Sequence, residues 1–528
     1  MLSKIKTATL SGVEGSVVVV ETDIRRGLPL FMVVGLADTT IKEACRRIRP
    51  AIMNSGYVFP NERVTVNLAP AGKPKEGSHF DLPIAVGIIA SSLMVIEDDM
   101  NETAFLGEVS LDGRINRING ALPLAMSLRK AGVKNIVIPR ANAEEVAMLR
   151  DVQILPASDL CSVVNHITGL ERIPAYESGL SFDMKKWNCD FSQVLGQEFA
   201  KRALMIGAAG NHGVLMIGDP GCGKTMLAKR IPTILPNLTY EEKLEITGIY
   251  SVAGLLEEKE PIIQQRPFRS PHHTISAAAL IGGGIRPRPG ELTLAHHGVL
   301  FLDELGEFDS RVIDAMRQPV EDGRVRIHRN LEEVVFPADV MLVAAANPCK
   351  CGNLWSENKI CTCTPRQIEN YMRKLSGPFS DRIDMHIKMH SVPEEEIEKY
   401  TAGKAEKLSA ENTMTYTGGA SSAEMKEKVE AAVGIQRARY KGTIYGSNSS
   451  LDEAGVSMFC ISDKNGEKMM REAYSRMGLS MRAYTRVRKV SRTIADLEGS
   501  EEIKEEHIAE ALMYRTGEMR ENHMYVQG

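Results

Sequence analysis

The sequence predicts an α/β protein built around a doubly wound parallel sheet, with a helical region after it. Three short runs between residues 186 and 392 are almost wholly apolar: Val214–Ile217, Val299–Leu302 and Val340–Ala346. Parallel strands that are covered by helices on both faces have this continuous pattern. The first run leads into Gly-Asp-Pro-Gly-Cys-Gly-Lys-Thr at 218–225, which fits the phosphate-binding pattern G-x-x-x-x-G-K-[ST].

Four segments are expected along the chain. Residues 1–167 alternate β-branched runs with amphipathic stretches and predict an α/β domain of their own. Residues 168–185 contain Pro, Ser and Gly and predict a linker, residues 186–392 hold the parallel sheet, and residues 393–528 predict a mostly helical, charged domain. Outside the sheet we expect strands at Val17–Val20, Val64–Leu68 and Ile136–Ile138, helices at Pro83–Leu93, Ala121–Ala131, Glu424–Tyr440 and Met481–Leu497, and an exposed loop from Ser409 to Ser422.

The composition is that of a soluble protein, with 43% apolar and 25% charged residues. The net charge of −4 neither indicates nor excludes a nucleic-acid partner, because a ring can confine basic residues to its pore. No run of about 18 apolar residues predicts a membrane span, and no signal peptide is indicated. Four of the nine cysteines lie between residues 349 and 363, which predicts a cytoplasmic protein with one local cysteine site.

The segment 218–225 joins the first apolar run to a predicted helix that runs toward Arg230, the context that the motif requires. Its glycines let backbone N–H groups face phosphate, and the helix N-terminus adds a favourable dipole. We expect Lys224 to hold the β- and γ-phosphates of ATP and Thr225 to bind Mg²⁺; the alternative is a glycine-rich turn with a chance lysine. The expected nucleotide contacts are Gly218, Asp219, Pro220, Gly221, Cys222, Gly223, Lys224 and Thr225.

Polar side chains follow the other two apolar runs. Asp303 and Glu304 come at the carboxyl end of Val299–Leu302, where ligands of open α/β sheets bind. Asp303 is expected to hold Mg²⁺ and Glu304 to polarise the attacking water, since phosphoryl transfer depends on positioning and charge stabilisation. Asn347 follows the third run and is expected to reach the γ-phosphate or to orient the water. A solvated acidic turn and an ordinary Asn-Pro turn are the alternatives.

Two cysteine pairs, Cys349-x-Cys351 and Cys361-x-Cys363, follow Asn347 closely. Four thiolates predict a tetrahedral, structural Zn²⁺ site, although the C-x-C spacing is tighter than the usual C-x₂-C. Free thiols and a reversible disulfide are the alternatives.

Seven further stretches carry a family resemblance: Val194–Gln197, Arg266–His273, Gly282–Gly284, Pro289–Glu304, Arg317–Gly323, Asn347–Cys349 and Ser491–Leu497. With them, nearly the whole chain resembles the magnesium-chelatase-like group of AAA+ ATPases that includes ComM and YifB. The resemblance implies an AAA+ core with a helical lid, ATP and Mg²⁺ as cofactors, and a homo-hexameric ring. It also implies that Gln197 lies at the nucleotide and that Asn347 is the sensor-1 residue, whereas His272 and His273 are expected to pack or form hydrogen bonds.

The resemblance assigns roles to two arginines. Arg382, within Ser380–Asp384, resembles the arginine finger that reaches the ATP of a neighbouring subunit, and Arg482 resembles sensor 2 on the lid. A guanidinium fixed beside the transferring phosphoryl group supplies a factor of about 10³–10⁵ in rate. Arg373 and Arg486 are the competing candidates, and a surface ion pair is the alternative for each role.

Two segments are expected to face the pore of such a ring. One is the Gly- and Pro-rich loop Gly282–Gly290. In the other, Arg324–Arg329, basic and apolar residues alternate after an Asp322–Gly323 turn, as in a hairpin strand with one basic face. Positive charge along a pore suits a phosphate backbone, and a solvated basic hairpin is the alternative. The candidate DNA contacts are Arg286, Arg288, Arg324, Arg326 and Arg329.

The resemblance therefore implies an ATP-driven translocase or branch-migration helicase on single-stranded or branched DNA, which aids recombination of incoming DNA in natural transformation. A magnesium-chelatase-type motor and a protein-remodelling AAA+ ATPase are the alternatives.

The first domain resembles the proteolytic domain of Lon proteases from Leu106–Val109 through Gly132–Pro139, together with Pro74–Gly77. Those enzymes use a Ser–Lys dyad. The Lon motif puts His79 at the nucleophile position, with Ser78 one residue early, and Leu122 at the lysine position. Because a leucine cannot take the serine proton, we expect the fold without protease activity.

Overall fold

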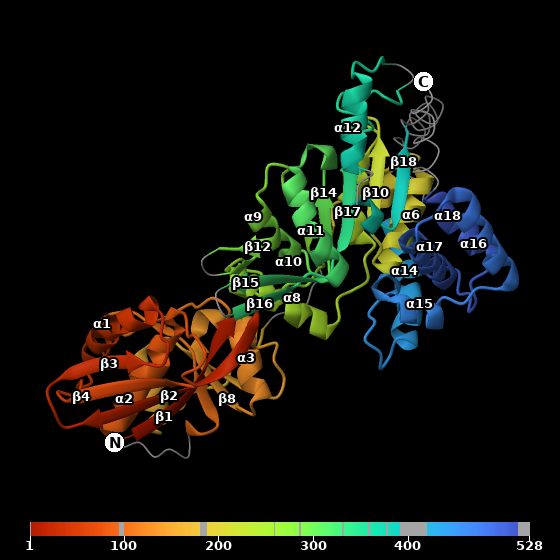
Figure 1. The fold of residues 1–528 in the computed structure, drawn as a ribbon. Helices are drawn as coiled ribbons and strands as arrows, with labels where there is room; N and C mark the ends of the chain where they lie inside the picture. The colour runs from red at the N-terminus through yellow and green to blue at the C-terminus, as the bar shows by residue number, and fades with distance from the viewer. Residues whose placement is uncertain are drawn as a thin grey trace, which may run out of the picture.

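The computed structural model describes residues 2–93, 100–179, 187–257, 259–284, 287–329, 332–356, 359–375, 379–390 and 420–515. Along the chain, two α/β units are followed by a group of C-terminal helices (Figure 1). Arg286, residues 180–185 of the predicted linker and residues 409–419 of the predicted loop lie outside the described residues. None of the described helices is both long and apolar enough to cross a membrane.

A mixed seven-stranded sheet, in the order β3-β4-β2-β1-β5-β8-β9, forms the first unit. Its strands are β1 (Leu2–Ser11), β2 (Glu14–Arg25), β3 (Leu30–Val34), β4 (Arg63–Ala69), β5 (Thr103–Phe105), β8 (Asn135–Pro139) and β9 (Gln153–Ala157), with a separate hairpin of β6 (Glu108–Val109) and β7 (Ile115–Asn116). Its helices are α1 (Thr39–Asn54), α2 (Asp81–Leu93), α3 (Ala121–Lys130), α4 (Ala143–Val146) and α5 (Leu160–Ile167). The predicted strands and helices of this unit are confirmed, and β1, which the sequence analysis missed, pairs with the whole length of β2.

The second unit contains a five-stranded parallel sheet in the order β11-β14-β17-β10-β18. The strands are β10 (Val214–Gly218), β11 (Phe268–Arg269), β14 (Val299–Leu302), β17 (Met341–Ala346) and β18 (Met385–Met389). The three predicted apolar runs are β10, β14 and β17, which adjoin in the centre of the sheet (Figure 1). The central position explains their continuous apolar character, since both faces of each strand are covered.

Each face of this sheet has its own core. Alternate residues such as Val214 and Met216 pack with α6 and the C-terminal helices, whereas Leu215 packs on the other side with α11 and α12. The parallel doubly wound sheet is therefore confirmed. The helices are α6 (Glu198–Gly210), α7 (Lys224–Ala228), α8 (Tyr240–Ala253), α9 (Ala277–Ile281), α10 (Glu291–Leu294), α11 (Ser310–Asp322), α12 (Pro365–Leu375), α14 (Ser422–Arg439), α15 (Glu453–Phe459), α16 (Lys464–Met477), α17 (Met481–Leu497) and α18 (Glu505–Met513).

Two small hairpins project from the second unit. β12 (Gly282–Gly283) pairs with β13 (Arg288–Pro289), and β15 (Arg324–Arg329) pairs with β16 (Glu332–Pro337). The predicted hairpin strand is confirmed, but the predicted turn is wrong, because Asp322 is the last residue of α11 and Gly323 caps that helix at φ +63°. A helix that ends in a left-handed glycine has the same local sequence signature as a tight hairpin turn.

The first unit packs against α8 of the second. The Leu244 side chain of α8 is 4% exposed and belongs to the same apolar cluster as α3; burying a leucine stabilises a contact by about 2 kcal/mol. Tyr240 donates from its hydroxyl to the carbonyl of Met148 at 2.7 Å. Ser251 donates to the buried carboxylate of Glu145 at 3.1 Å.

Candidate nucleotide site and metal cluster

The loop between β10 and α7 is shaped by two glycines. Gly221 and Gly223 have φ of +86° and +96°, a left-handed conformation that glycine adopts without strain. A Cβ atom added at Gly221 would meet nothing within 4 Å, so the loop is open there. Lys224 is the first residue of α7, and its Nζ donates to the carbonyls of Gly218 at 2.6 Å and Asp219 at 2.9 Å. The ammonium group therefore lies inside the curl of the loop.

Side chains that follow the ends of three adjacent strands, β10, β14 and β17, meet beside this loop. Thr225 Oγ1 donates to Asp303 Oδ2 at 2.8 Å, and Lys224 Nζ donates to Asn347 Oδ1 at 3.2 Å. The carboxyl ends of parallel strands share one edge of a sheet, which is why residues far apart in sequence come together. A hydroxyl beside a carboxylate fits Mg²⁺, which prefers oxygen ligands, and an ammonium in an open glycine loop fits a polyphosphate.

Gln197 lies against the loop from the N-terminus of α6. Its Nε2 donates to the carbonyl of His390 at 2.7 Å and to that of Cys222 at 3.4 Å. The side chain thus contacts the backbone of the loop at Cys222.

Glu304 lies one residue beyond Asp303 in a left-handed conformation with φ of +55°, and its side chain is 56% exposed. His273 Nδ1 is 3.3 Å from Glu304 Oε2. The sequence indicated only packing or hydrogen bonding for His273, because nothing in its own neighbourhood showed that the segment after β11 returns to the end of β14.

Arg382 does not lie near the nucleotide loop of its own chain. β18 follows it and runs parallel to β10, from Met385 beside Val214 to Met389 beside Gly218. Five residues of strand span about 16 Å, so Arg382 lies at the opposite edge of the sheet. There its Nε donates to Glu321 Oε2 at 3.0 Å.

Arg482 is the second residue of α17. Arg486, one turn later on the same face of α17, donates from Nη1 to Asp384 Oδ1 at 2.7 Å and also to the carbonyl of Arg382. Arg482 itself is exposed at the start of the helix. The competing candidate Arg373 pairs with Glu369 at 2.8 Å on α12 and is 72% exposed.

Burial and charge fix the segment that carries Arg382. Burial by itself would raise the pKa of the Asp384 carboxyl. The Arg486 guanidinium and the hydrogen bond with His212 outweigh burial and hold this pKa below its ordinary value. His212 Nδ1 is 3.0 Å from Asp384 Oδ2. This segment therefore connects the parallel sheet to the C-terminal helix α17.

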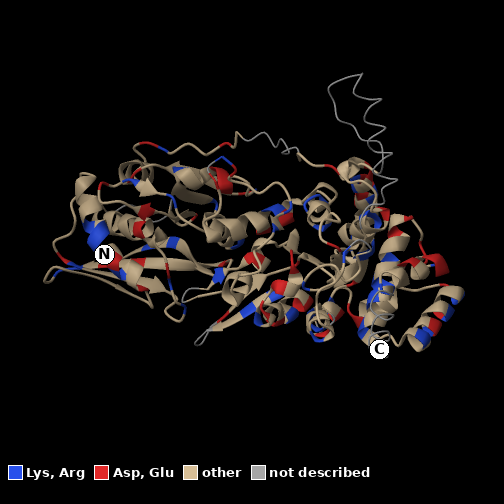
Figure 2. Ribbon diagram, turned by 90° about the horizontal axis from the view of Figure 1, so that it is seen from above, with Lys and Arg blue, Asp and Glu red and all other residues tan. Residues whose placement is uncertain are grey.

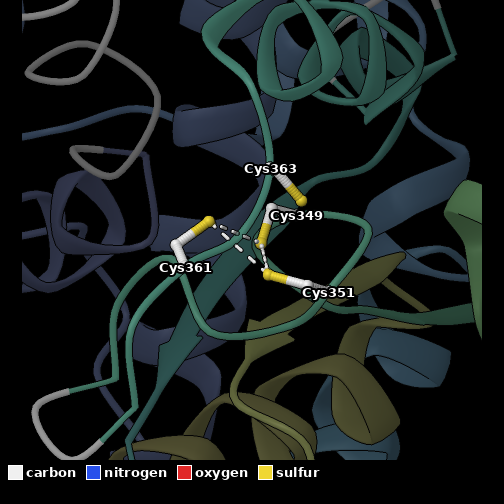
Figure 3. A group of neighbouring side chains, drawn as sticks. All are labelled: Cys349, Cys351, Cys361 and Cys363. Carbon is white, nitrogen blue, oxygen red and sulfur yellow. Dashed lines mark hydrogen bonds between the residues drawn. The ribbon is translucent and has the colours of Figure 1, made fainter.

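The four predicted cysteines converge on one point (Figure 3). The Sγ atoms of Cys349, Cys351 and Cys361 are 3.3–3.7 Å apart, and all four lie within 4.8 Å of one another. A tetrahedral Zn²⁺ with Zn–S bonds of about 2.3 Å spaces its sulfurs by about 3.8 Å, whereas a disulfide requires about 2.05 Å. Backbone N–H groups of Asn353 and Thr362 donate to Cys351 and lower the pKa of this thiol to about 5. The donor set fits a structural metal.

The cysteine cluster is in contact with the nucleotide loop. A Cβ atom added at Gly352 would lie 2.5 Å from Pro220 Cγ and 3.9 Å from Asn347 Cγ. On α12, which follows Cys363, Lys374 Nζ donates to the carbonyl of Gly306 at 3.1 Å, just beyond the carboxylates of β14. A residue within the cluster therefore contacts the nucleotide loop, and the helix that follows the cluster contacts the loop after β14.

A second cluster, of Glu245, His296 and His297, does not fit a metal. His296 Nδ1 accepts the backbone N–H of Asp339 at 3.1 Å. The proton of this neutral imidazole is then on Nε2, which is 3.2 Å from Glu245 Oε2 and donates to it. An imidazole nitrogen that carries a proton has no lone pair for a metal.

The candidate DNA contacts are exposed where the structure describes them. Arg324, Arg326 and His328 lie on the exposed face of β15, whereas Val325 is buried on the other. Arg288 is exposed on β13, and Arg286 and the Arg329 side chain lie outside the described residues. Elsewhere basic and acidic residues are interspersed along the core and the C-terminal helices (Figure 2), in keeping with the net charge of −4.

The two positions of the first unit that correspond to the Lon dyad, His79 and Leu122, are buried. His79 is 4% exposed, its Nε2 lies 2.9 Å from the carbonyl of Ala8, and burial lowers its pKa to about 4. Leu122 is 0% exposed in the apolar core.

Comparison with known families matches three parts of the chain. The profile for magnesium chelatase subunit ChlI matches residues 190–397, a second profile for that subunit matches residues 20–142, and the profile for its C-terminal region matches residues 419–515. The 38 kDa magnesium-chelatase subunit of Cereibacter sphaeroides is 25% identical over 174 residues, which is 30% of this chain and 52% of that protein.

Two relatives match almost end to end. The competence protein ComM of Haemophilus influenzae is 40% identical over 511 residues, 96% of this chain and 95% of that protein. YifB of Escherichia coli is 40% identical over 517 residues, 97% of each chain. Together with the parallel sheet, its nucleotide loop and the helical C-terminus, these matches show that the chain belongs to the ComM/YifB group of magnesium-chelatase-like AAA+ proteins, a family that indicates ATPase activity with ATP and Mg²⁺.

Proposed function

We propose that this chain is an ATP-hydrolysing motor that assembles as a homo-hexamer and moves single-stranded or branched DNA, as a branch-migration helicase in the recombination of incoming DNA. The observation that carries the proposal is the exposed basic face of β15, which α11 connects to the carboxylates that follow β14. A backbone-tracking motor needs positive charge that is mechanically joined to its nucleotide site. A relative with 40% identity carries the name competence protein.

At the nucleotide, Lys224 binds the β- and γ-phosphates, and Thr225 and Asp303 hold Mg²⁺, which supplies charge neutralisation of the phosphates. Glu304 takes up the proton of the attacking water, and Asn347 orients that water. The 2.8 Å contact of Thr225 with Asp303 and the 3.2 Å contact of Lys224 with Asn347 support these roles.

Arg382 acts in trans, on the ATP of a neighbouring subunit, and Arg482 is the sensor-2 residue on the lid. The support is that Arg382 lies about one strand length from the nucleotide loop of its own chain. A guanidinium there cannot touch its own ATP. The active site is consequently complete only between two subunits, and an isolated chain should turn over ATP poorly.

We also propose four segments with distinct roles. Residues 1–167 form a Lon-protease-like domain without the Ser–Lys dyad, residues 168–185 the linker, residues 186–392 the AAA+ core and residues 393–528 the lid. The buried, bonded ring of His79 supports the absence of proteolysis. The first domain serves ring assembly or contact with DNA or partners.

Zinc is proposed as the metal of the cysteine cluster, with Cys349, Cys351, Cys361 and Cys363 as its four ligands. Sulfur spacings near those of a tetrahedral site support this choice, because thiolates select Zn²⁺ over Mg²⁺. Four protein ligands leave no position for substrate, so the metal is structural.

The test is the ATPase rate of the full-length protein with and without single-stranded and four-way-junction DNA, at two salt concentrations. Stimulation by DNA that weakens as salt rises is expected, because binding to phosphates releases counterions. No DNA binding at low salt with a non-hydrolysable ATP analogue would overturn the proposal. ATPase stimulation by an unfolded protein substrate instead of DNA would favour protein remodelling, and dependence on added chelatase subunits would favour a chelatase-type motor.

A further inference from the structure

The guanidinium of Arg382 is already occupied within its own chain. Its Nε and Nη2 lie 3.0 Å and 2.9 Å from the same oxygen, Glu321 Oε2. The Arg382 side chain is 14% exposed and that of Glu321 is 43% exposed. A partly shielded, side-on ion pair of this kind binds the edge of the guanidinium that offers two parallel donors.

Glu321 stands at the root of the basic hairpin. It belongs to the last turn of α11, and only Asp322 and Gly323 separate it from Arg324, the first residue of β15. The same cleft, of about 1110 Å³, is lined by Glu321, Arg324 and Arg382. A change in the partner of the Glu321 carboxylate therefore affects the end of α11 and the adjoining strand that carries the candidate DNA contacts.

The backbone around Arg382, by contrast, is fixed. Arg486 donates to its carbonyl, and Arg515 donates to the carbonyls of Ile383 at 2.5 Å and Asp384 at 3.1 Å. Both arginines come from the C-terminal helical region. With its main chain fixed from that side, Arg382 can change partners only by rotating its side chain.

We propose that Glu321 is a positioning residue for Arg382: it holds the guanidinium while no ATP is present in the neighbouring subunit, and it releases it when the γ-phosphate arrives. The phosphate and the carboxylate compete for the same pair of donors, so ATP in one subunit breaks an ion pair at the root of the hairpin of the next. The inference rests on the proposed function, because it takes Arg382 as the finger and the hairpin as the DNA contact.

The test compares Glu321→Gln with the unmodified protein, both as assembled full-length rings. The substitution removes the competing charge but keeps the shape of the side chain. We expect KM for ATP to fall about twofold to fivefold, the range that a partly exposed ion pair carries, and the stimulation of ATP hydrolysis by DNA to fall as well. The control is Glu472→Gln, which removes a carboxylate of similar exposure, 47%, from a surface pair with Arg476 on α16 and should change neither quantity.

A double-mutant cycle separates this role from a structural one. In an Arg382→Ala background, Glu321→Gln should leave the affinity for a fluorescent ATP analogue unchanged, because the partner is already absent. The inference is overturned if Glu321→Gln behaves like Glu472→Gln, or if its effect is undiminished without Arg382. Failure of DNA to stimulate the unmodified ring contradicts the proposed function, whereas KM and the cycle still report on the pair.

Discussion

Gly352→Ala tests whether the cysteine loop shapes the nucleotide loop. Gly352 has φ of +83°, and a Cβ atom there would lie 2.5 Å from Pro220 Cγ and 2.9 Å from its Cδ. Both distances are shorter than any tolerated carbon contact, and Pro220 cannot rotate away because its ring is part of the backbone. Overpacking of this kind costs about 1–3 kcal/mol. If the nucleotide loop moves to relieve the overlap and this energy is lost from ATP binding, KM for ATP rises about fivefold to a hundredfold.

The matched control is Gly442→Ala. Gly442 has nearly the same φ, +82°, but nothing lies within 4 Å of its added Cβ. Both variants share the left-handed backbone strain, so their difference isolates the contact with Pro220. KM and zinc content are measured for both. Equal KM values would refute the reasoning, and loss of zinc at unchanged KM would show that the cysteine loop, not the nucleotide loop, gives way.

Three further predictions concern other parts of the molecule. Arg382→Ala subunits and Glu304→Gln subunits should each be nearly inactive, and their mixture should recover part of the ATP turnover if the finger acts in trans; a mixture that stays inactive speaks against that role. Purified protein should contain about one zinc per chain by metal analysis, and Cys361→Ser should lower it severalfold; equal zinc in both would count against the cluster. Burial raises the pKa of Glu145 to about 7 from 4.5, so this carboxyl favours the folded state most below pH 4.5 and the folded state loses that stability as pH rises through 7. Glu145→Gln should therefore raise the melting temperature at pH 8 and change it little at pH 5, and an equal shift at both values would contradict that sign.

The sequence was sufficient for the features that local pattern encodes. The motif at 218–225 and the carboxylates Asp303 and Glu304 could be placed because each directly follows a strand that is apolar throughout. A continuous apolar run indicates a buried parallel strand, and the parallel topology places the carboxyl ends of such strands side by side. The convergence of the cysteines could likewise be predicted from their spacing.

The features that the sequence missed depend on contacts between distant segments. The contact of His273 with Glu304, the packing of Gly352 on Pro220 and the pairing of Glu321 with Arg382 each join residues from different elements. No periodicity signals such a contact. β11 and β18 were missed for another reason, because a two-residue strand is too short for a pattern and β18 alternates apolar residues with His386 and Lys388.

The most direct test of the central claim is movement of a labelled four-way junction by the assembled ring. With ATP and Mg²⁺, the account predicts that the junction is resolved into duplex products, that Glu304→Gln binds the junction without resolving it, and that Arg324→Gln with Arg326→Gln lowers both binding and its salt dependence. A ring that hydrolyses ATP at full rate beside an intact junction would contradict the account.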